Sequence, residues 1–183
     1  MIISSWNIRG LNDPLKQVEV KFFLRKYKVD VLGLLETRVR EHKAAAIFKK
    51  SFSSYKVINN YSHHCNGRIW VIYNPRTVTI SSTLMHDQLI LLEVLYHATN
   101  SIVSITIVYG SNSALSRSSL WNVLRDLSVG QDSWLVLGDF NIVKDFGERL
   151  GPNPLLLNDV LAFNQCILDC ALEDVHSTSC VHT

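Results

Sequence analysis

The chain has 183 residues, of which 47% are hydrophobic and 19% are charged, and its net charge is +2. This composition excludes an intrinsically disordered or collagen-like protein, because enough apolar surface is present to fill the core of a globular domain. Four cysteines are too few for a disulfide-dense secreted scaffold, so we expect reduced thiols.

The apolar segments are short, and the N-terminus has no basic region followed by a long apolar core. Runs such as Ile69–Tyr73 and Leu89–Leu92 are far shorter than a membrane span, and no signal peptide is recognisable. No linker, repeat or low-complexity tract divides the sequence. We therefore predict an intracellular protein without a membrane partner and a single domain over residues 1–183.

Charge is distributed unevenly along the chain. Residues 1–76 hold 14 Lys and Arg against 5 Asp and Glu, whereas residues 77–183 hold 4 against 11. This asymmetry fits a surface that faces a polyanion beside an acidic, cation-binding side. Two solvated faces of opposite charge would give the same counts, and most individual charges fit that simpler interpretation.

The first 50 residues alternate between strand and helix patterns. Ile2–Trp6 predicts a strand, and Asn12 or Asp13 followed by Pro14 marks the start of a helix that runs to about Tyr27. Val29–Leu35 predicts a buried strand, and the Ala-rich segment Val39–Lys50 predicts a second helix.

Strand patterns then dominate as far as Tyr109, with turn residues between most of them. The predicted strands are Tyr55–Ile58, Arg68–Tyr73, Thr77–Ser81, Gln88–Tyr96 and Ile102–Tyr109. A helix from Ser116 to about Leu127, a buried strand at Trp134–Leu137 and a last helix at Asn158–Cys170 complete the order. This order predicts an α/β fold of two packed sheets flanked by helices.

Polar side chains follow four of these apolar runs. They are Asn7, Glu36, Tyr109, and Asp139 with Asn141. Ligands favour such rims in layered α/β folds, so a common site at one rim is expected. Gly138, before Asp139, suits a turn or the close approach of another group.

Taken singly, each residue has a simpler explanation. Asn7 would be a turn residue, Glu36 an acid near a helix N-terminus, and Tyr109 a core tyrosine whose hydroxyl finds a partner. Asp139 and Asn141 could satisfy local backbone groups in an Asx turn. Their joint occurrence favours a site.

Four ordered motifs resemble the endonuclease/exonuclease/phosphatase superfamily. They are Trp6-Asn7-Ile8-Arg9-Gly10-Leu11, Leu34-Leu35-Glu36-Thr37, Val108-Tyr109-Gly110-Ser111-Asn112 and Gly138-Asp139-Phe140-Asn141. Finer details, including Leu11-Asn12-Asp13-Pro14 and Gly67-Arg68-Ile69-Trp70, are most similar to the endonuclease domain of plant LINE-type retrotransposons. The resemblance implies a four-layer α/β sandwich with two mixed, mostly antiparallel sheets flanked by helices.

The resemblance also implies residue roles in metal-dependent cleavage of a DNA phosphodiester by water. Glu36 and Asn7 would hold Mg²⁺, or Mn²⁺ in its place, which suits these hard oxygen donors. Asp139 would orient and deprotonate the water, Asn141 would steady it, and Tyr109 would contact the phosphate or the leaving oxygen. Asn112 and Arg9 would bind the phosphate or the DNA; Arg9 stands where apurinic-site relatives carry an acid, although LINE-type relatives share the arginine.

The family's Ser-Asp-His motif is absent, since none of the seven histidines follows an Asp. We therefore expect a domain truncated before its C-terminal strands, which leaves the fold incomplete and its activity weak or lost. An uncovered sheet edge would favour self-association. By family resemblance the protein would act in the nucleus.

Two other functions remain open. A phosphatase or phosphodiesterase of the same fold would act on small phosphate esters and not on DNA. A non-catalytic nucleic-acid-binding remnant would bind DNA without needing Mg²⁺ or Glu36.

Overall fold

The structure is a computed structural model that describes residues 1–64, 66–148 and 156–175. The chain divides into two compact units, one of Met1–Tyr109 with Ser133–Asp139 and one of Gly110–Asp132 with Phe140–Thr183. Within the described ranges, no helix is long and apolar enough to cross a bilayer.

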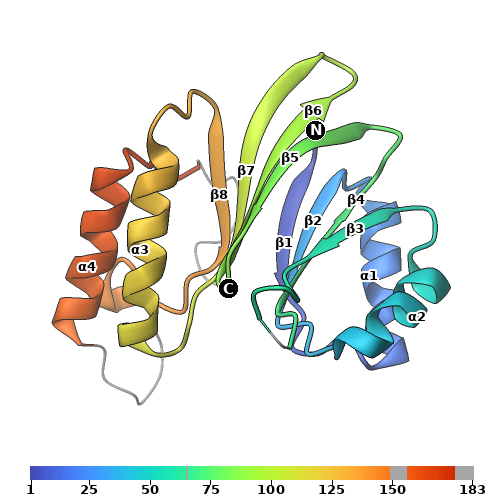
Figure 1. The fold of residues 1–183 in the computed structure, drawn as a ribbon, viewed down its shortest axis with the longest axis horizontal. Helices are drawn as coiled ribbons and strands as arrows, with labels where there is room; N and C mark the ends of the chain where they lie inside the picture. The colour runs from blue at the N-terminus through green and yellow to red at the C-terminus, as the bar shows by residue number, and fades with distance from the viewer. Residues whose placement is uncertain (65, 149–155, 176–183) are drawn as a thin grey trace. The chain divides into compact units, whose positions relative to one another are not determined.

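The first unit contains two four-stranded sheets and two helices (Figure 1). One sheet has the order β1-β2-β4-β3 and the other β5-β6-β7-β8. The strands span Ile3–Asn7 (β1), Val31–Leu35 (β2), Lys56–Asn59 (β3), Ile69–Tyr73 (β4), Val78–Met85 (β5), Leu89–Tyr96 (β6), Ser101–Tyr109 (β7) and Trp134–Asp139 (β8). β1 pairs with β2 and β7 with β8 in parallel, and the other four pairings are antiparallel. The predicted α/β class, with two mixed and mostly antiparallel sheets, is confirmed.

Alternation along β2 explains how the first sheet packs on both faces. Leu32 and Leu34 join the cluster that includes Val20 and Leu24 of helix α1 (Pro14–Lys26). Val31 and Leu35 point to the opposite face and join a cluster with residues of β6 and β7. Because successive side chains of a strand alternate between faces, one apolar strand supports both layers. Figure 1 shows α1 and α2 (Glu41–Ser51) on the side of this sheet away from the second sheet.

The two sheets of the first unit approach closely at Gly33. A side-chain carbon there would lie 2.6 Å from Cγ2 of Ile107 on β7. The absence of a side chain at this position therefore lets the β-branched residues of β7 pack against β2.

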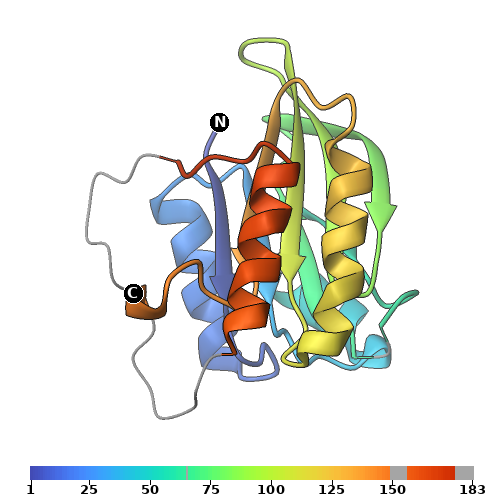
Figure 2. The same cartoon turned by 90° about the vertical axis from the view of Figure 1, so that its left-hand side faces the viewer.

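The second unit contains helices α3 (Ala114–Ser128) and α4 (Leu157–Asp169) and a short 3₁₀ turn, η1 (Phe146–Glu148). The two helices lie side by side (Figure 2). Trp121, Phe140 and Phe163 form their aromatic contact, with ring centroids 5.0–6.4 Å apart. These aromatic rings supply the apolar contact that holds the helix pair.

Several predicted boundaries need correction. The α3 cap is Ser113 and not Ser116, so the helix begins earlier. β5 extends to Met85, beyond the predicted end at Ser81, because a register shift between Ile80 and Ser82 lets pairing with β6 continue past the polar residues. β8 runs through Asp139 and is half-buried, unlike the buried strand predicted for Trp134–Leu137, since it stands at the end of its sheet.

The start of α1 follows the prediction. Asp13 is the N-cap, its side chain accepts a hydrogen bond from the Leu15 backbone N–H at 2.9 Å, and Pro14 is the first helical residue. Proline suits this position because its missing N–H would have no partner in the helix.

Candidate active site

Glu36 is held at the end of β2 by a ladder of contacts from the loop that follows β1. The backbone N–H of Gly10 donates to the Glu36 carbonyl at 2.8 Å, and that of Leu11 donates to the Thr37 carbonyl at 2.7 Å. The Asn12 side chain continues the series with a 2.8 Å bond to the Arg38 carbonyl. Three consecutive carbonyls are therefore fixed, and the Glu36 side chain starts from a well-defined backbone.

The backbone around this carboxylate adopts the left-handed conformation at three non-glycine residues. Arg9, Glu36 and Arg38 have φ angles of 48°, 52° and 51°. Such residues are uncommon, cost about 1–3 kcal/mol each, and gather at functional sites. The helix-terminus explanation for Glu36 does not hold, because α2 begins five residues later at Glu41.

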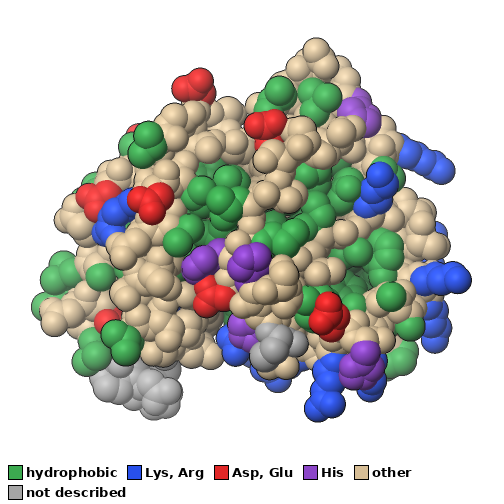
Figure 3. All heavy atoms as spheres, viewed as in Figure 1, with side chains coloured by type: hydrophobic (Ala, Val, Ile, Leu, Met, Phe, Trp, Pro, Cys, Tyr) green, Lys and Arg blue, Asp and Glu red, His purple; other side chains and the backbone are tan. Residues whose placement is uncertain are grey.

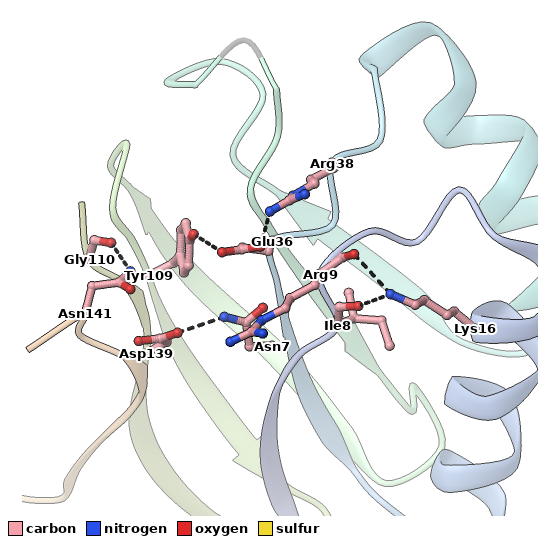
Figure 4. A network of polar contacts seen from close by, with 10 residues as sticks. All are labelled: Asn7, Ile8, Arg9, Lys16, Glu36, Arg38, Tyr109, Gly110, Asp139 and Asn141. Carbon is pink, nitrogen blue, oxygen red and sulfur yellow. Dashed lines mark hydrogen bonds and ion pairs between the residues drawn. The ribbon is translucent and has the colours of Figure 1, made fainter. Parts of the chain in front are cut away.

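Both carboxylate oxygens of Glu36 have partners. Oε1 accepts from the Tyr109 hydroxyl at 2.5 Å, and Oε2 accepts from Nη2 of Arg38 at 2.7 Å (Figure 4). Burial favours a higher pKa for Glu36, but these two hydrogen bonds and the charges of Arg38 and Arg9 outweigh it and lower the pKa. The carboxylate is therefore ionised at neutral pH.

Tyr109 is a buried residue that ends β7. Only 3% of the residue is exposed, and the guanidinium of Arg68 lies 5.6 Å from the centre of its ring. Burial and the hydrogen bond to Glu36 raise the pKa of Tyr109 to about 12, so the hydroxyl keeps its proton and acts as a donor. The core-tyrosine explanation is thus correct for the ring, and the partner of the hydroxyl is the candidate metal ligand.

Asn7 and Asp139 form the second contact of the site. The Asn7 side-chain N–H donates to Oδ2 of Asp139 at 2.7 Å (Figure 4), although 132 residues separate them in sequence. The Asx-turn explanation for Asp139 does not account for this bond to Asn7. Asp139 is the last residue of β8 and Asn7 the last of β1, so both side chains leave the ends of strands.

Strand register links these two contacts. Asn7 pairs with Leu35, directly before Glu36, and Tyr109 pairs with Asp139 across the parallel β7–β8 ladder. Gly138 is needed in this ladder, because a side-chain carbon there would lie 2.0 Å from the Val108 carbonyl oxygen. The prediction that this glycine allows a close approach is confirmed. Four strand ends of the first unit thus bring Asn7, Glu36, Tyr109 and Asp139 together.

The donors at these strand ends suit a hard divalent cation. Asn7 Oδ1 is buried and accepts no hydrogen bond from any described residue, and a buried oxygen without a partner calls for a ligand. Beside it stand the ionised Glu36 and the Asp139 carboxylate. One or two carboxylates with neutral oxygens and water are the usual Mg²⁺ environment. Within the described ranges, no group of three or more His, Cys, Asp or Glu residues could hold a metal ion.

Two predicted residues belong to the second unit. Asn141, with a φ of 54°, donates from its side chain to the Gly110 carbonyl at 2.6 Å. Asn112 is exposed, and its carbonyl accepts from Arg117 at 3.2 Å. The explanation that the Asn141 side chain satisfies a backbone group therefore holds within the second unit.

Arg9, the other predicted phosphate contact, is exposed. Its carbonyl and that of Ile8 accept hydrogen bonds from Lys16 Nζ at 3.0 and 2.8 Å (Figure 4). Lys16 thereby fixes the loop that carries Arg9.

Two arginines of the site were missed in the sequence. Arg38 pairs with Glu36, and Arg68 lies against Tyr109. Arg38 stands two residues after Glu36, where an arginine near a strand-end acid was the available signal, and Arg68 lies within the motif Gly67-Arg68-Ile69-Trp70. Thr37 joins the two segments, since its hydroxyl donates to the Gly67 carbonyl at 2.7 Å.

Comparison with known proteins bears on the family and the fold of the chain. A family model described as the endonuclease/exonuclease/phosphatase family matches residues 4–179. The comparison with curated proteins gives no significant match.

Solved structures share the fold at low sequence identity. A 3′ phosphatase from Neisseria bound to a product DNA hairpin has a TM-score of 0.66 and 20% identity, over 92% of this chain and 70% of that one. An AP endonuclease from Archaeoglobus fulgidus gives 0.64 and 18%, again over 92% and 70%. TDP2 from D. rerio, complexed with a single-stranded DNA product, gives 0.58 and 16%, over 76% of this chain and 60% of that one. The chain thus spans less than two thirds of the length of this last relative.

Proposed function

This chain belongs to the endonuclease/exonuclease/phosphatase family, and on that premise we propose that it is a metal-dependent endonuclease that nicks DNA. The observation that carries the proposal is the meeting of four strand-end residues. Two hydrogen bonds, Asn7 to Asp139 at 2.7 Å and Tyr109 to Glu36 at 2.5 Å, tie together residues that are far apart in the sequence.

Glu36 and Asn7 would hold Mg²⁺, with Mn²⁺ as a substitute. Glu36 offers a carboxylate that is ionised at neutral pH, and Asn7 offers the buried oxygen that accepts no hydrogen bond from the part of the chain that the structure describes. When bound, the ion would neutralise charge that develops on the phosphoryl group and the leaving oxygen.

Asp139 would accept the proton of the attacking water on its carboxylate. The Asn7 side chain orients that carboxylate by donating to Oδ2, and a positioned carboxylate can act as a general base. Tyr109 keeps its proton at neutral pH, because its pKa is about 12. Once DNA is bound, its single O–H would turn from Glu36 and donate to the phosphate or the leaving oxygen. Asn141 would steady the water, and Asn112 and Arg9 would contact the phosphate backbone.

DNA is the proposed partner. Two neighbours of the same fold were solved with DNA bound. In this chain, Lys and Arg side chains gather over α1 and α2 (Figure 3), where the exposed basic residues include Arg25, Lys26, Lys43, Lys49 and Lys50. Phosphate contacts from such residues would make binding fall steeply as salt rises.

A plasmid-nicking assay tests the proposal. Wild-type protein should relax supercoiled DNA only with Mg²⁺ or Mn²⁺, and Glu36→Gln and Asp139→Asn should each lower the rate by about a hundredfold or more. Glu19→Gln makes the same charge change on the exposed face of α1 and should leave the rate within about twofold. Equal rates for all three variants would contradict the proposed site.

Small substrates separate the alternatives. Hydrolysis of nitrophenyl phosphate esters without cleavage of DNA would identify a phosphatase or phosphodiesterase. Salt-sensitive DNA binding that is independent of both Mg²⁺ and Glu36 would identify a non-catalytic remnant. We expect slow nicking by this 183-residue chain alone, since it carries no Ser-Asp-His motif.

A finer proposal concerns origin. The motifs around Arg9 and Arg68 support descent from the endonuclease domain of a plant LINE-type retrotransposon, whose site of action would be the nucleus. A Ser-Asp-His-bearing continuation and a reverse-transcriptase reading frame in the DNA after the Thr183 codon would establish both that origin and a truncated domain. The residues at that end, 176–183, lie outside the described part of the chain.

A further inference from the structure

We propose that Arg38 is an exchangeable counter-ion of Glu36, which competes with the divalent cation for the carboxylate and thereby sets how tightly the cation binds. This inference rests on the proposed function, because it takes Glu36 as a metal ligand. It goes further by naming a residue, on the solvent side of the site, that tunes metal affinity.

The starting point is that Glu36 has no carboxylate oxygen without a partner. The Tyr109 hydroxyl contacts Oε1 and the Arg38 guanidinium contacts Oε2. Each oxygen keeps a second lone pair for a cation, but the Arg38 guanidinium carries a positive charge 2.7 Å from Oε2. A divalent cation on this carboxylate therefore meets a like charge at close range, which weakens or displaces the Arg38 contact.

Burial decides which contact gives way. Tyr109 is 3% exposed and lies within the core cluster between the sheets, so its hydroxyl would lose its acceptor without gaining water. The Arg38 side chain is 66% exposed, whereas that of Glu36 is 16% exposed. The guanidinium can turn into solvent at little cost, as is usual for an exposed ion pair. Displacement of Arg38 from Oε2 is thus the easier exchange.

The backbone keeps Arg38 within reach of Glu36 after such an exchange. Its carbonyl is held by the Asn12 side chain at 2.8 Å, and its φ angle of 51° places it in the left-handed region. Only the flexible side chain needs to move. A side chain tethered in this way acts as a local competitor at high effective concentration.

The test measures metal binding without DNA and without turnover. Mn²⁺ would be titrated into the full chain at pH 7.5, and free Mn²⁺ would be followed by its electron paramagnetic resonance signal. Arg38→Ala should bind Mn²⁺ about two- to fivefold more tightly than wild type, which corresponds to about 0.4–1 kcal/mol, the range of exposed ion pairs. Arg38→Lys keeps a point charge but loses the planar fork, so its dissociation constant should fall between those of wild type and Arg38→Ala.

Arg40→Ala is the matched control. Arg40 is also exposed and stands two residues after Arg38. Removing its charge therefore reports the general electrostatic effect of a lost arginine on Mn²⁺ affinity. Arg38→Asn provides a second variant whose side chain tolerates the left-handed backbone, should Arg38→Ala fail to fold.

The outcomes separate the two proposals. Equal affinities for Arg38→Ala and Arg40→Ala, while Glu36→Gln weakens binding, would overturn the counter-ion role and leave the metal site intact. Absence of any Mn²⁺ binding that depends on Glu36 would overturn the proposed function and the counter-ion role with it. Tighter binding by Arg38→Ala that disappears in the Glu36→Gln background supports both.

Discussion

Replacing Tyr109 by Phe removes one hydroxyl from the centre of the candidate site. In the wild type this hydroxyl donates to Oε1 of Glu36 at 2.5 Å, and the ring is buried. A hydrogen bond to a charged group contributes about 1.5–3 kcal/mol to stability. Glu36 keeps its contact with Arg38 and is partly exposed, with 16% of its side chain accessible, so water can replace part of the loss. We therefore expect a loss near the lower end of that range, about 1.5 kcal/mol.

Thermal unfolding measures this loss. For a chain of this size each kcal/mol lowers Tm by about 2–4 °C, so Tyr109→Phe should lower Tm by about 3–6 °C at pH 7. The difference from wild type should shrink as pH falls from about 4.5, the ordinary pKa of a glutamate, through the lowered pKa of Glu36. The sign follows because a depressed carboxylate pKa contributes stability above its unfolded value and loses it below its folded value.

Tyr73→Phe is the matched control within the same unit. Tyr73 is half-buried at the end of β4, and no hydrogen bond of its hydroxyl to another described residue is found, so Tm should change by less than about 1–2 °C. Equal losses for the two tyrosines, or a Tyr109→Phe loss that persists unchanged at pH 3, would refute the assignment of the stability to the Glu36 contact.

Two further predictions concern the strand ends and alkaline pH. Gly138→Ala should cost about 3 kcal/mol or more in urea unfolding, because it adds a carbon 2.0 Å from the Val108 carbonyl oxygen at a φ of 145°. The control Gly130→Ala, where φ is 79° and no atom lies within 4 Å, should cost only about 1–2 kcal/mol. Similar costs for the two variants would contradict the close approach at Gly138. The raised pKa of Tyr109 contributes stability that is complete below pH 10 and is lost as pH rises to about 12. Urea titrations across this window should show a larger loss in wild type than in Tyr109→Phe, which keeps the contributions of Tyr61 and Tyr73, because burial raises the pKa of both.

Much of the fold follows from local patterns. The apolar run of β2 and the Asp13-Pro14 start of α1 match the structure closely, because strand alternation and capping depend on residues near one another in sequence. The predicted boundaries were wrong where pairing with a neighbouring strand set the end of an element. β5 runs past Ser81 because its partner β6 continues alongside it, and the strand preference of Thr83 alone is too weak a signal to indicate this.

The sequence by itself determined which residues stand at the strand ends and to which family the chain belongs. Asn7, Glu36, Tyr109 and Asp139 are recognisable as polar groups at the ends of apolar runs. Their types alone already indicate hard-cation and phosphate chemistry.

Only the tertiary structure decided how these residues pair. That Asn7 bonds to Asp139, that Tyr109 bonds to Glu36, and that Arg38 occupies the second carboxylate oxygen follow from register between distant strands and from left-handed backbone at Glu36 and Arg38. The physical reason is range: periodicity and capping act over a few residues, whereas contacts across 73 and 132 residues exist only after the strands have paired.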